Sequence, residues 1–318
     1  MRLLDFLKKD GRDLDRKRES LILKVVAYLD HHNLSTIPSV LAKIMEVGRN
    51  PNATVGDYAR LYEMDQSSCM RLLVLANSVY YGARTGAVIR NVEEAIVRVG
   101  MRRAQEVINS SIVAGLFKSS VVIEDYSTTD LWLNSVAVAV GNRVLCAALP
   151  APPPGGGRID PYLAGLLHDV GISIEHQCFY QDGFREAVES RARGQGLLLD
   201  EEARHLSVTH AELGMEIAHR WKMPEELAAV LGHHHDLAVD GPEPLRLLHV
   251  TRTAQWIAYE LRLGYSDFGD AQAPEYLASR RALGLDDARY AKVKEQVSLE
   301  IQRLKDLGWF SALKVRHV

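Results

Sequence analysis

The sequence predicts an all-α protein, and three observations support that class. Apolar residues recur at steps of three and four along most of the 318 residues, which is the period of an amphipathic helix. The alternation of aromatic and β-branched residues that is typical of half-buried strands is nearly absent. Residues that cap helices precede several apolar stripes, and glycine or proline follows them. We therefore expect about a dozen helices.

The composition limits the classes of function. Hydrophobic residues make up 47% and charged residues 25%, as in a water-soluble globular protein. We find no run of about 18 uninterrupted apolar residues and no secretory signal, so we expect a cytoplasmic protein without a membrane partner. The net charge of −3 gives no general attraction for nucleic acid. The three cysteines, Cys69, Cys146 and Cys178, fit reduced thiols.

The first half of the chain has apolar stripes with identifiable ends. Thr54 and Asp57 have the spacing of a capping box, with Asp in place of the usual Glu. Asn77 and Ser78 are interpreted as a helix stop whose side chains bond to the backbone. Asn91 is a predicted N-cap, and Gly100 interrupts the stripe behind it. The predicted helices are 21–29, 38–47, one that begins near 55, 72–76 and 91–99.

The second half begins with a predicted helix over 127–145, capped by Ser127. A Pro- and Gly-rich stretch at 150–157 cannot be helical and is a predicted loop. Polar residues near 118–129 mark a weak boundary between the two halves. Further helices are predicted over 162–170, 201–220, 224–232, 245–263 and 290–307.

The histidines are the candidates for chemistry. His168 and Asp169 stand side by side near the end of a predicted helix, an arrangement that suits a divalent cation. Taken singly, each histidine has a plainer explanation, such as a hydrogen-bonded pair or a favourable place at the end of a helix dipole. The ordered set favours a metal site, and its candidate ligands are His168, Asp169, His210, His234 and His235.

The segment 164–171, Ala-Gly-Leu-Leu-His-Asp-Val-Gly, resembles the signature of the HD superfamily of metal-dependent phosphohydrolases. Segments 34–38, 72–82 and 92–100 resemble, more specifically, the HDOD family (HD-related output domain) of bacterial signalling proteins. The resemblance covers about residues 30–260. It implies an N-terminal helical half (30–120) packed on an HD-like helical half (126–260). A charged helical lead-in (1–29) precedes this domain, and a C-terminal helical extension (261–318) follows it.

The resemblance also implies a damaged metal site. Active HD phosphohydrolases use an early His and a late Asp beside the His-Asp pair, and Asn134 and Arg252 stand at those positions here. A guanidinium cannot ligate a cation, so we hypothesise that Arg252 pairs with Asp169 in place of a metal. His210, His234 and His235 match extra ligands of HD-GYP cyclic-di-GMP phosphodiesterases, although the Gly-Tyr-Pro loop is absent. The remaining cluster is a relic, a one-metal site or a hydrogen-bonded histidine cluster.

Three functions follow. The leading one is a non-catalytic signalling or regulatory protein without a cofactor, which binds signalling partners, with a cyclic-di-GMP pathway as one candidate. The second is a metal-dependent phosphohydrolase or phosphodiesterase acting on a nucleotide or cyclic-nucleotide phosphoester, with Fe, Mn, Zn or Ni on the five candidate ligands. The third is a nucleotide- or nucleic-acid-binding module, which we disfavour because its basic residues also fit an exposed helix face. Those residues are Arg84, Arg90, Arg98, Arg102 and Arg103.

Overall fold

A computed structural model provides the structure of the protein. It describes residues 20–21, 23–25, 36–62, 66–81, 88–117, 123, 126–150, 159–194, 197–236, 242–267 and 269–310. Those residues form 15 α-helices and no β-strand, with a single isolated bridge between Ile123 and Tyr126. The predicted all-α class is therefore confirmed. The predicted lead-in 1–29 lies largely outside the described residues, as do the 150–157 loop beyond Pro150 and Arg84.

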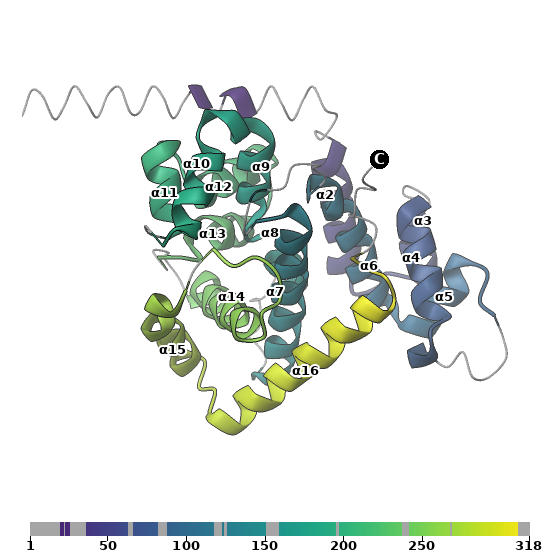
Figure 1. Cartoon of the computed structure of the whole chain (residues 1–318). Helices are drawn as coiled ribbons and strands as arrows, with labels where there is room; N and C mark the ends of the chain where they lie inside the picture. The colour runs from purple at the N-terminus through teal and green to yellow at the C-terminus, as the bar shows by residue number, and fades with distance from the viewer. Residues whose placement is uncertain are drawn as a thin grey trace, which may run out of the picture.

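The N-terminal half is a layer of short helices on one side of the molecule (Figure 1). The capping box at its second helix forms as predicted, because Thr54 N donates to Asp57 Oδ2 at 2.8 Å and Asp57 N donates to Thr54 Oγ1 at 3.2 Å. The Asn91 side chain likewise accepts from Glu94 N at 2.8 Å. The elements are α2 (Thr36–Arg49), α3 (Val55–Tyr62), α4 (Gln66–Ala76), η1 (Val79–Tyr81), α5 (Val92–Val99), α6 (Met101–Val113) and η3 (Ala114–Phe117).

Asn77 ends α4, as predicted. Its Nδ2 donates to the carbonyls of Leu73 at 3.0 Å and Ile89 at 2.8 Å, and its Oδ1 accepts from Ile89 N at 2.8 Å. These three bonds satisfy main-chain groups at the helix end and at the start of the next ordered segment. The side chain is therefore committed to the backbone and is not available to a ligand.

The second half is arranged around α7 (Thr128–Ala148), which lies at the centre of the molecule and packs against α8, α14 and α16 (Figure 1). Ser127 caps α7 by accepting from Asp130 N at 3.0 Å. The other elements are α8 (Pro161–Leu167), α9 (Val170–Phe179), η4 (Tyr180–Asp182), α10 (Phe184–Ala192), α11 (Leu198–His205), α12 (His210–Arg220), α13 (Glu225–His233), α14 (Pro242–Glu260), η5 (Asp270–Gln272), α15 (Ala273–Ala282) and α16 (Asp287–Asp306).

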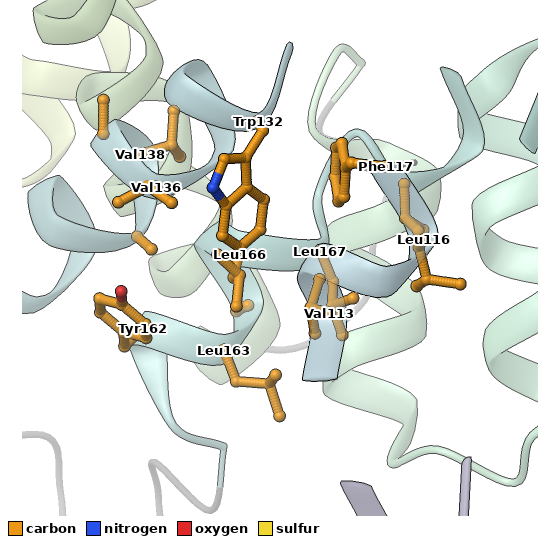
Figure 2. Packing of buried hydrophobic residues seen from close by; sticks show 14 of the residues in the cluster. Val113, Leu116, Phe117, Trp132, Val136, Val138, Tyr162, Leu163, Leu166 and Leu167 are labelled. Carbon is orange, nitrogen blue, oxygen red and sulfur yellow. The ribbon is translucent and has the colours of Figure 1, made fainter. Parts of the chain in front are cut away.

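The core is continuous between the two halves. Trp132 of α7 is fully buried, and its ring centroid lies 5.2 Å from that of Phe117. Figure 2 shows Trp132 above Leu163 and Leu166 of α8, with Phe117 and Leu116 to one side and Val113 below them, next to Leu167. α7 is long and apolar enough to cross a bilayer by composition alone, but 72% of its most apolar window is buried. Its apolar surface therefore packs inside this protein as a core helix.

Two predicted helices are wrong in extent. The segment 201–220 is not one helix, because α11 ends at His205 and α12 begins at His210. Ser207 has a left-handed φ of 66°, and Thr209 and Glu212 form a capping box that starts the new helix. The segment 162–170 is also interrupted, because α8 ends at Leu167 and α9 starts at Val170. Both interruptions place a histidine at a helix end.

A half-buried carboxyl group joins α6 to the start of α8. Asp160 caps α8 by accepting from Tyr162 N at 3.0 Å, and Asn109 Nδ2 of α6 donates to its other oxygen at 3.3 Å. Burial raises the pKa of the Asp160 carboxyl to about 6. In the unfolded chain the same group ionises near 3.8. The folded protein therefore binds a proton more tightly than the unfolded chain, and this contribution to stability is lost as pH rises through about 6.

We expect Asp160→Asn to stabilise the protein at pH 8, by roughly 1–2 kcal/mol, because the amide keeps the cap without a half-buried charge. The Asn109 amide can turn so that its unpartnered Oδ1 accepts from the new side chain. Thermal unfolding between pH 4 and pH 8 measures the gain, which disappears near pH 4. Asp286→Asn, at the exposed N-cap of α16, is the matched control. An equal effect at both pH values would contradict the explanation.

Candidate metal centre

The interruption between α8 and α9 turns two side chains into the protein interior. His168 is the C-cap of α8 and Asp169 precedes α9, and they are 0% and 2% exposed. Nδ1 of His168 lies 2.8 Å from the carbonyl of Gly165, to which it donates. The other ring nitrogen, Nε2, lies 2.9 Å from Asp169 Oδ2.

The N-terminus of α12 approaches this turn closely because residue 171 is glycine. A Cβ at Gly171 would lie 2.0 Å from the carbonyl oxygen of His210, well inside van der Waals contact. His210 is the first residue of α12, and Glu202 Oε2 of α11 accepts from both its backbone N at 3.0 Å and its Nδ1 at 2.7 Å. Glu202 therefore fixes the ring so that Nε2 faces Asp169.

The end of α13 supplies two further imidazoles. His234 is the C-cap of α13, and its Nδ1 lies 3.1 Å from the carbonyl oxygens of both Val230 and Leu231. A carbonyl only accepts, so this nitrogen carries the proton of the neutral ring. Nε2 of His234 then carries the lone pair, and it lies 3.2 Å from Asp169 Oδ1. The adjacent His235 places its Nε2 at 3.0 Å from Nε2 of His210.

A second carboxylate, which the sequence analysis missed, completes the cluster. Asp267 lies in the loop after α14 and is 2% exposed, with Oδ2 at 2.9 Å from His235 Nε2. The loop is fixed on α7, because Tyr265 N donates to the carbonyl of Asp130 at 3.1 Å. Gly264 has a φ of +85°, and a Cβ there would lie 2.1 Å from that same carbonyl oxygen. No motif spacing marks Asp267, because a loop has no fixed period.

Together these residues form one five-residue cluster, composed of Asp169, His210, His234, His235 and Asp267. Each offers one ligand atom, and the five atoms lie within 4.8 Å of one another. Four of the predicted ligands therefore come together, while His168 lies beside Asp169 at the edge of the cluster. Its role as a ligand stays a prediction.

The two carboxyl groups of the cluster are ionised despite their burial. Burial by itself raises the pKa of Asp169, but the neighbouring imidazole of His168 holds that pKa well below its usual range. Burial and Asp169 also raise the pKa of Asp267, yet His235 and His210 lower it by more. The cluster therefore holds two negative charges with little access to water.

The imidazoles differ sharply in basicity. Burial lowers the pKa of His210, but Glu202 outweighs burial and brings that pKa to about 9. Burial and the neighbouring His235 lower the pKa of His234 to about 3, so this ring is neutral at pH 7. The lone pair on His234 Nε2 then faces the carboxylate of Asp169, and two acceptors confront each other.

The donor set fits a divalent cation. Three buried acceptors of this region have no hydrogen-bond donor among the described residues, namely Asp169 Oδ1, His234 Nε2 and Asp267 Oδ1. A cation between the acceptors would satisfy them, as facing lone pairs alone cannot. Three imidazoles with two carboxylates suit Fe, Mn, Zn or Ni. The partners of His210 and His234 behind the cluster are those that orient metal-bound imidazoles.

Asn134 and Arg252 stand at the two positions where the resemblance implies that a metal ligand has been lost. Both side chains make other contacts. The amide of Asn134 donates to the carbonyl of Leu263 at 3.4 Å. Arg252 donates to Glu275 Oε2 at 2.8 Å and lies over the ring of Tyr276. The hypothesis that Arg252 pairs with Asp169 is therefore wrong. The side chain reaches α15 instead, and Asp267 supplies a second carboxylate from a different segment.

The predicted basic surface is less basic than the sequence indicates. Arg103 of α6 is held by Glu106 at 2.7 Å and by Glu300 of α16 at 2.6 Å, so its charge is balanced within the fold. Arg90 and Arg102 are exposed, and Arg98 is half-buried. Binding of a nucleotide or nucleic acid at this surface stays a prediction.

The fold and the cluster define an all-α protein with a buried candidate metal centre. The family model described as "HDOD domain" matches residues 34–237, and the chain therefore belongs to the HDOD domain family. An uncharacterised protein of Treponema pallidum (strain Nichols) is 26% identical over 216 residues, which are 64% of this chain and 38% of that protein. The chain thus spans about two fifths of the length of this relative. Asp267 lies outside the matched residues.

Three solved structures share the fold. An HDOD domain protein of unknown function from Geobacter sulfurreducens is 21% identical, with a TM-score of 0.69 over 92% of this chain and 98% of that one. A "Putative signal transduction protein" from Marinobacter aquaeolei VT8 is 24% identical, with a TM-score of 0.65 over 88% and 59%. A "Putative phosphohydrolase" from Shewanella amazonensis SB2B is 19% identical, with a TM-score of 0.60 over 90% and 96%.

We expect Asp267→Asn to weaken the binding of Zn²⁺ or Mn²⁺ by at least about 100-fold, because the cluster loses one of its two negative charges. Asp270→Asn changes a nearby exposed carboxylate, which accepts from Tyr259, and is the matched control. Calorimetric titration of each variant with the metal measures the difference. Equal affinities of Asp267→Asn and the unaltered protein would exclude Asp267 from the site.

We expect Gly171→Ala to destabilise the protein by about 2–4 kcal/mol and to weaken the metal site, because the methyl group pushes His210 away. Gly115→Ala is the control, since a Cβ there meets nothing within 4 Å. Denaturant unfolding measures the loss. A Gly171→Ala variant as stable as Gly115→Ala would show that α9 and α12 do not pack this closely.

Proposed function

We propose that this HDOD protein is a non-catalytic signalling protein whose HD-like half binds one divalent metal ion as a structural element. The observation that carries the proposal is the burial of the cluster. Asp169, His210, His234 and Asp267 are each at most 2% exposed, and only His235, at 17%, reaches solvent. A catalytic metal ion keeps an open position for water or substrate, whereas a structural ion is enclosed by protein donors.

A metal ion at the cluster would hold four separate segments of the chain together. The five residues come from the start of α9, the start of α12, the end of α13 and the loop after α14. A bound cation supplies coordination bonds that hold these four segments together and offsets the repulsion between Asp169 and Asp267. The chain's own residues fix the rings, through Glu202 at His210 and backbone carbonyls at His234.

The output of such a protein is binding to other signalling proteins. The description of the Marinobacter protein as a "Putative signal transduction protein" supports this part of the proposal, and membership of the HDOD family agrees with it. A cytoplasmic location, and the division into 30–120, 126–260 and 261–318, belong to the same proposal. A cyclic-di-GMP pathway is one candidate for the signalling context.

Metal content and hydrolysis, measured on the same untagged preparation, test the proposal. We expect about one equivalent of metal, a melting temperature that falls by about 5 °C or more on chelation, and no hydrolysis of bis-p-nitrophenyl phosphate or cyclic-di-GMP. His234→Ala should remove the metal, while His219→Ala, a change at an exposed ring on α12, should not. Protein that binds no added metal, or hydrolysis that His234→Ala abolishes, would overturn the proposal.

Metal-dependent phosphohydrolysis is the second candidate. The partial exposure of His235 favours this candidate. Among the described residues of the cluster, only His235 reaches solvent, so a phosphoester could approach the ion from its side. The Shewanella protein described as a "Putative phosphohydrolase" shares the fold. In this case the ion would lower the pKa of a bound water, and the hydrolysis assay above would be positive.

A further inference from the structure

A cavity lies between the N-terminal half and α16, and none of the five cluster residues lines it. Its volume is about 330 Å³, which is within the range of small-molecule sites. Leu75 of α4 and Tyr80 of η1 line one side, while Leu304, Leu307 and Trp309 line the side formed by α16 and the turn after it. A neighbouring cavity of about 180 Å³ shares Leu75, Leu307 and Trp309. The lining is therefore mainly apolar and aromatic.

One wall of the cavity carries charges that balance one another. Glu106 of α6 and Glu300 of α16 each contact both Arg103 and Arg143. Burial would lower the pKa of Arg103, but the two carboxylates outweigh burial and raise it above its ordinary value. The two guanidinium groups and the two carboxylates pair with one another, so this wall offers a ligand no net charge.

Two nitrogen donors of the lining, on Arg303 and Trp309, are not used by the paired charges. Arg303 of α16 lies over the Tyr80 ring, 4.6 Å from its centroid, with no ionic partner in the described part of the chain. Trp309 is only 6% exposed, and its Nε1–H has no acceptor among the described residues. A buried indole N–H without an acceptor is unusual and costly. The cavity thus combines one unpaired positive charge, one buried donor and a flat apolar lining.

We propose that this cavity binds a small organic acid with a planar apolar body, whose acidic group accepts hydrogen bonds from Arg303 and Trp309. A carboxylate supplies the negative charge for the guanidinium and an acceptor for the indole N–H. The body lies among Leu75, Leu304 and Leu307. A cation has no unpaired carboxylate to meet here, and a polyanion would face Glu106 and Glu300.

The indole resonances of tryptophan test this site directly. The chain has four tryptophans, and 15N labelling of their indoles gives one signal each, with Trp309 identified by its loss in Trp309→Phe. The probe is 2-naphthoate, and 2-naphthamide is the uncharged control of the same shape. We expect 2-naphthoate to shift the Trp309 signal downfield while the other three stay in place, and to bind at least about tenfold more tightly than the amide.

Variants on α16 distinguish binding at this site from non-specific binding of the probe. Arg303→Gln should weaken 2-naphthoate about tenfold and leave 2-naphthamide unchanged, because only the charge is removed. Arg289→Gln, at an exposed arginine on the same helix, should leave both affinities unchanged. The proposal is overturned by a Trp309 signal that does not move at millimolar probe, by similar shifts of all four signals, or by equal binding of acid and amide. An Arg303→Gln variant that binds 2-naphthoate like the unaltered protein also overturns it.

Discussion

The electrostatic cost of burying Asp169 and Asp267 together is the constraint on which this half of the structure depends. Two ionised carboxylates out of water repel one another, and each loses several kcal/mol of hydration free energy. Positive charge between them offsets this cost. Protonated His210 offsets part of that cost, because Glu202 holds its pKa at about 9. Neutral His234 does not, and it presents a lone pair to Asp169. A divalent cation resolves both conflicts at once.

The fold around the cluster is consistent with that requirement. The chain breaks between α8 and α9, so that His168 and Asp169 face inward. Gly171 lets the first residue of α12, His210, come into contact with α9. α7 is the central helix (Figure 1), and the carbonyl of its Asp130 anchors the loop of Asp267 by accepting from Tyr265 N. α16 then ties the N-terminal half to α7, through Glu300 on Arg103 and Arg143. Neither half is therefore independent of the other.

Much of this could be predicted from local sequence signals. The helix class, the caps at Thr54, Asn91 and Ser127, and the stop at Asn77 follow from short-range patterns. Four of the five cluster residues were among the predicted candidates, because a His-Asp pair and three further histidines follow one another along the sequence. The break at Ser207 was missed, since the apolar period continues through it and only the Thr209–Glu212 pair marks a new start.

Asp267 and the fate of Arg252 could not be predicted in this way. Asp267 reaches the cluster through a loop whose path depends on Gly264 and on a bond to α7, which are tertiary features. Arg252 lies on α14 near the expected position of the late carboxylate, but the structure pairs it with Glu275 of α15. A missing ligand in a motif therefore does not establish a missing site, because another segment can supply the carboxylate.

X-ray absorption at the edge of the bound metal tests the central claim most directly. A site made by the five-residue cluster predicts about three imidazoles and two carboxylate oxygens around one ion at about 2.0–2.2 Å, with the multiple scattering of imidazole rings. Loss of a single oxygen in Asp267→Asn would complete the assignment. An oxygen-only shell without imidazole scattering would contradict it, because an ion bound in that way would lie elsewhere.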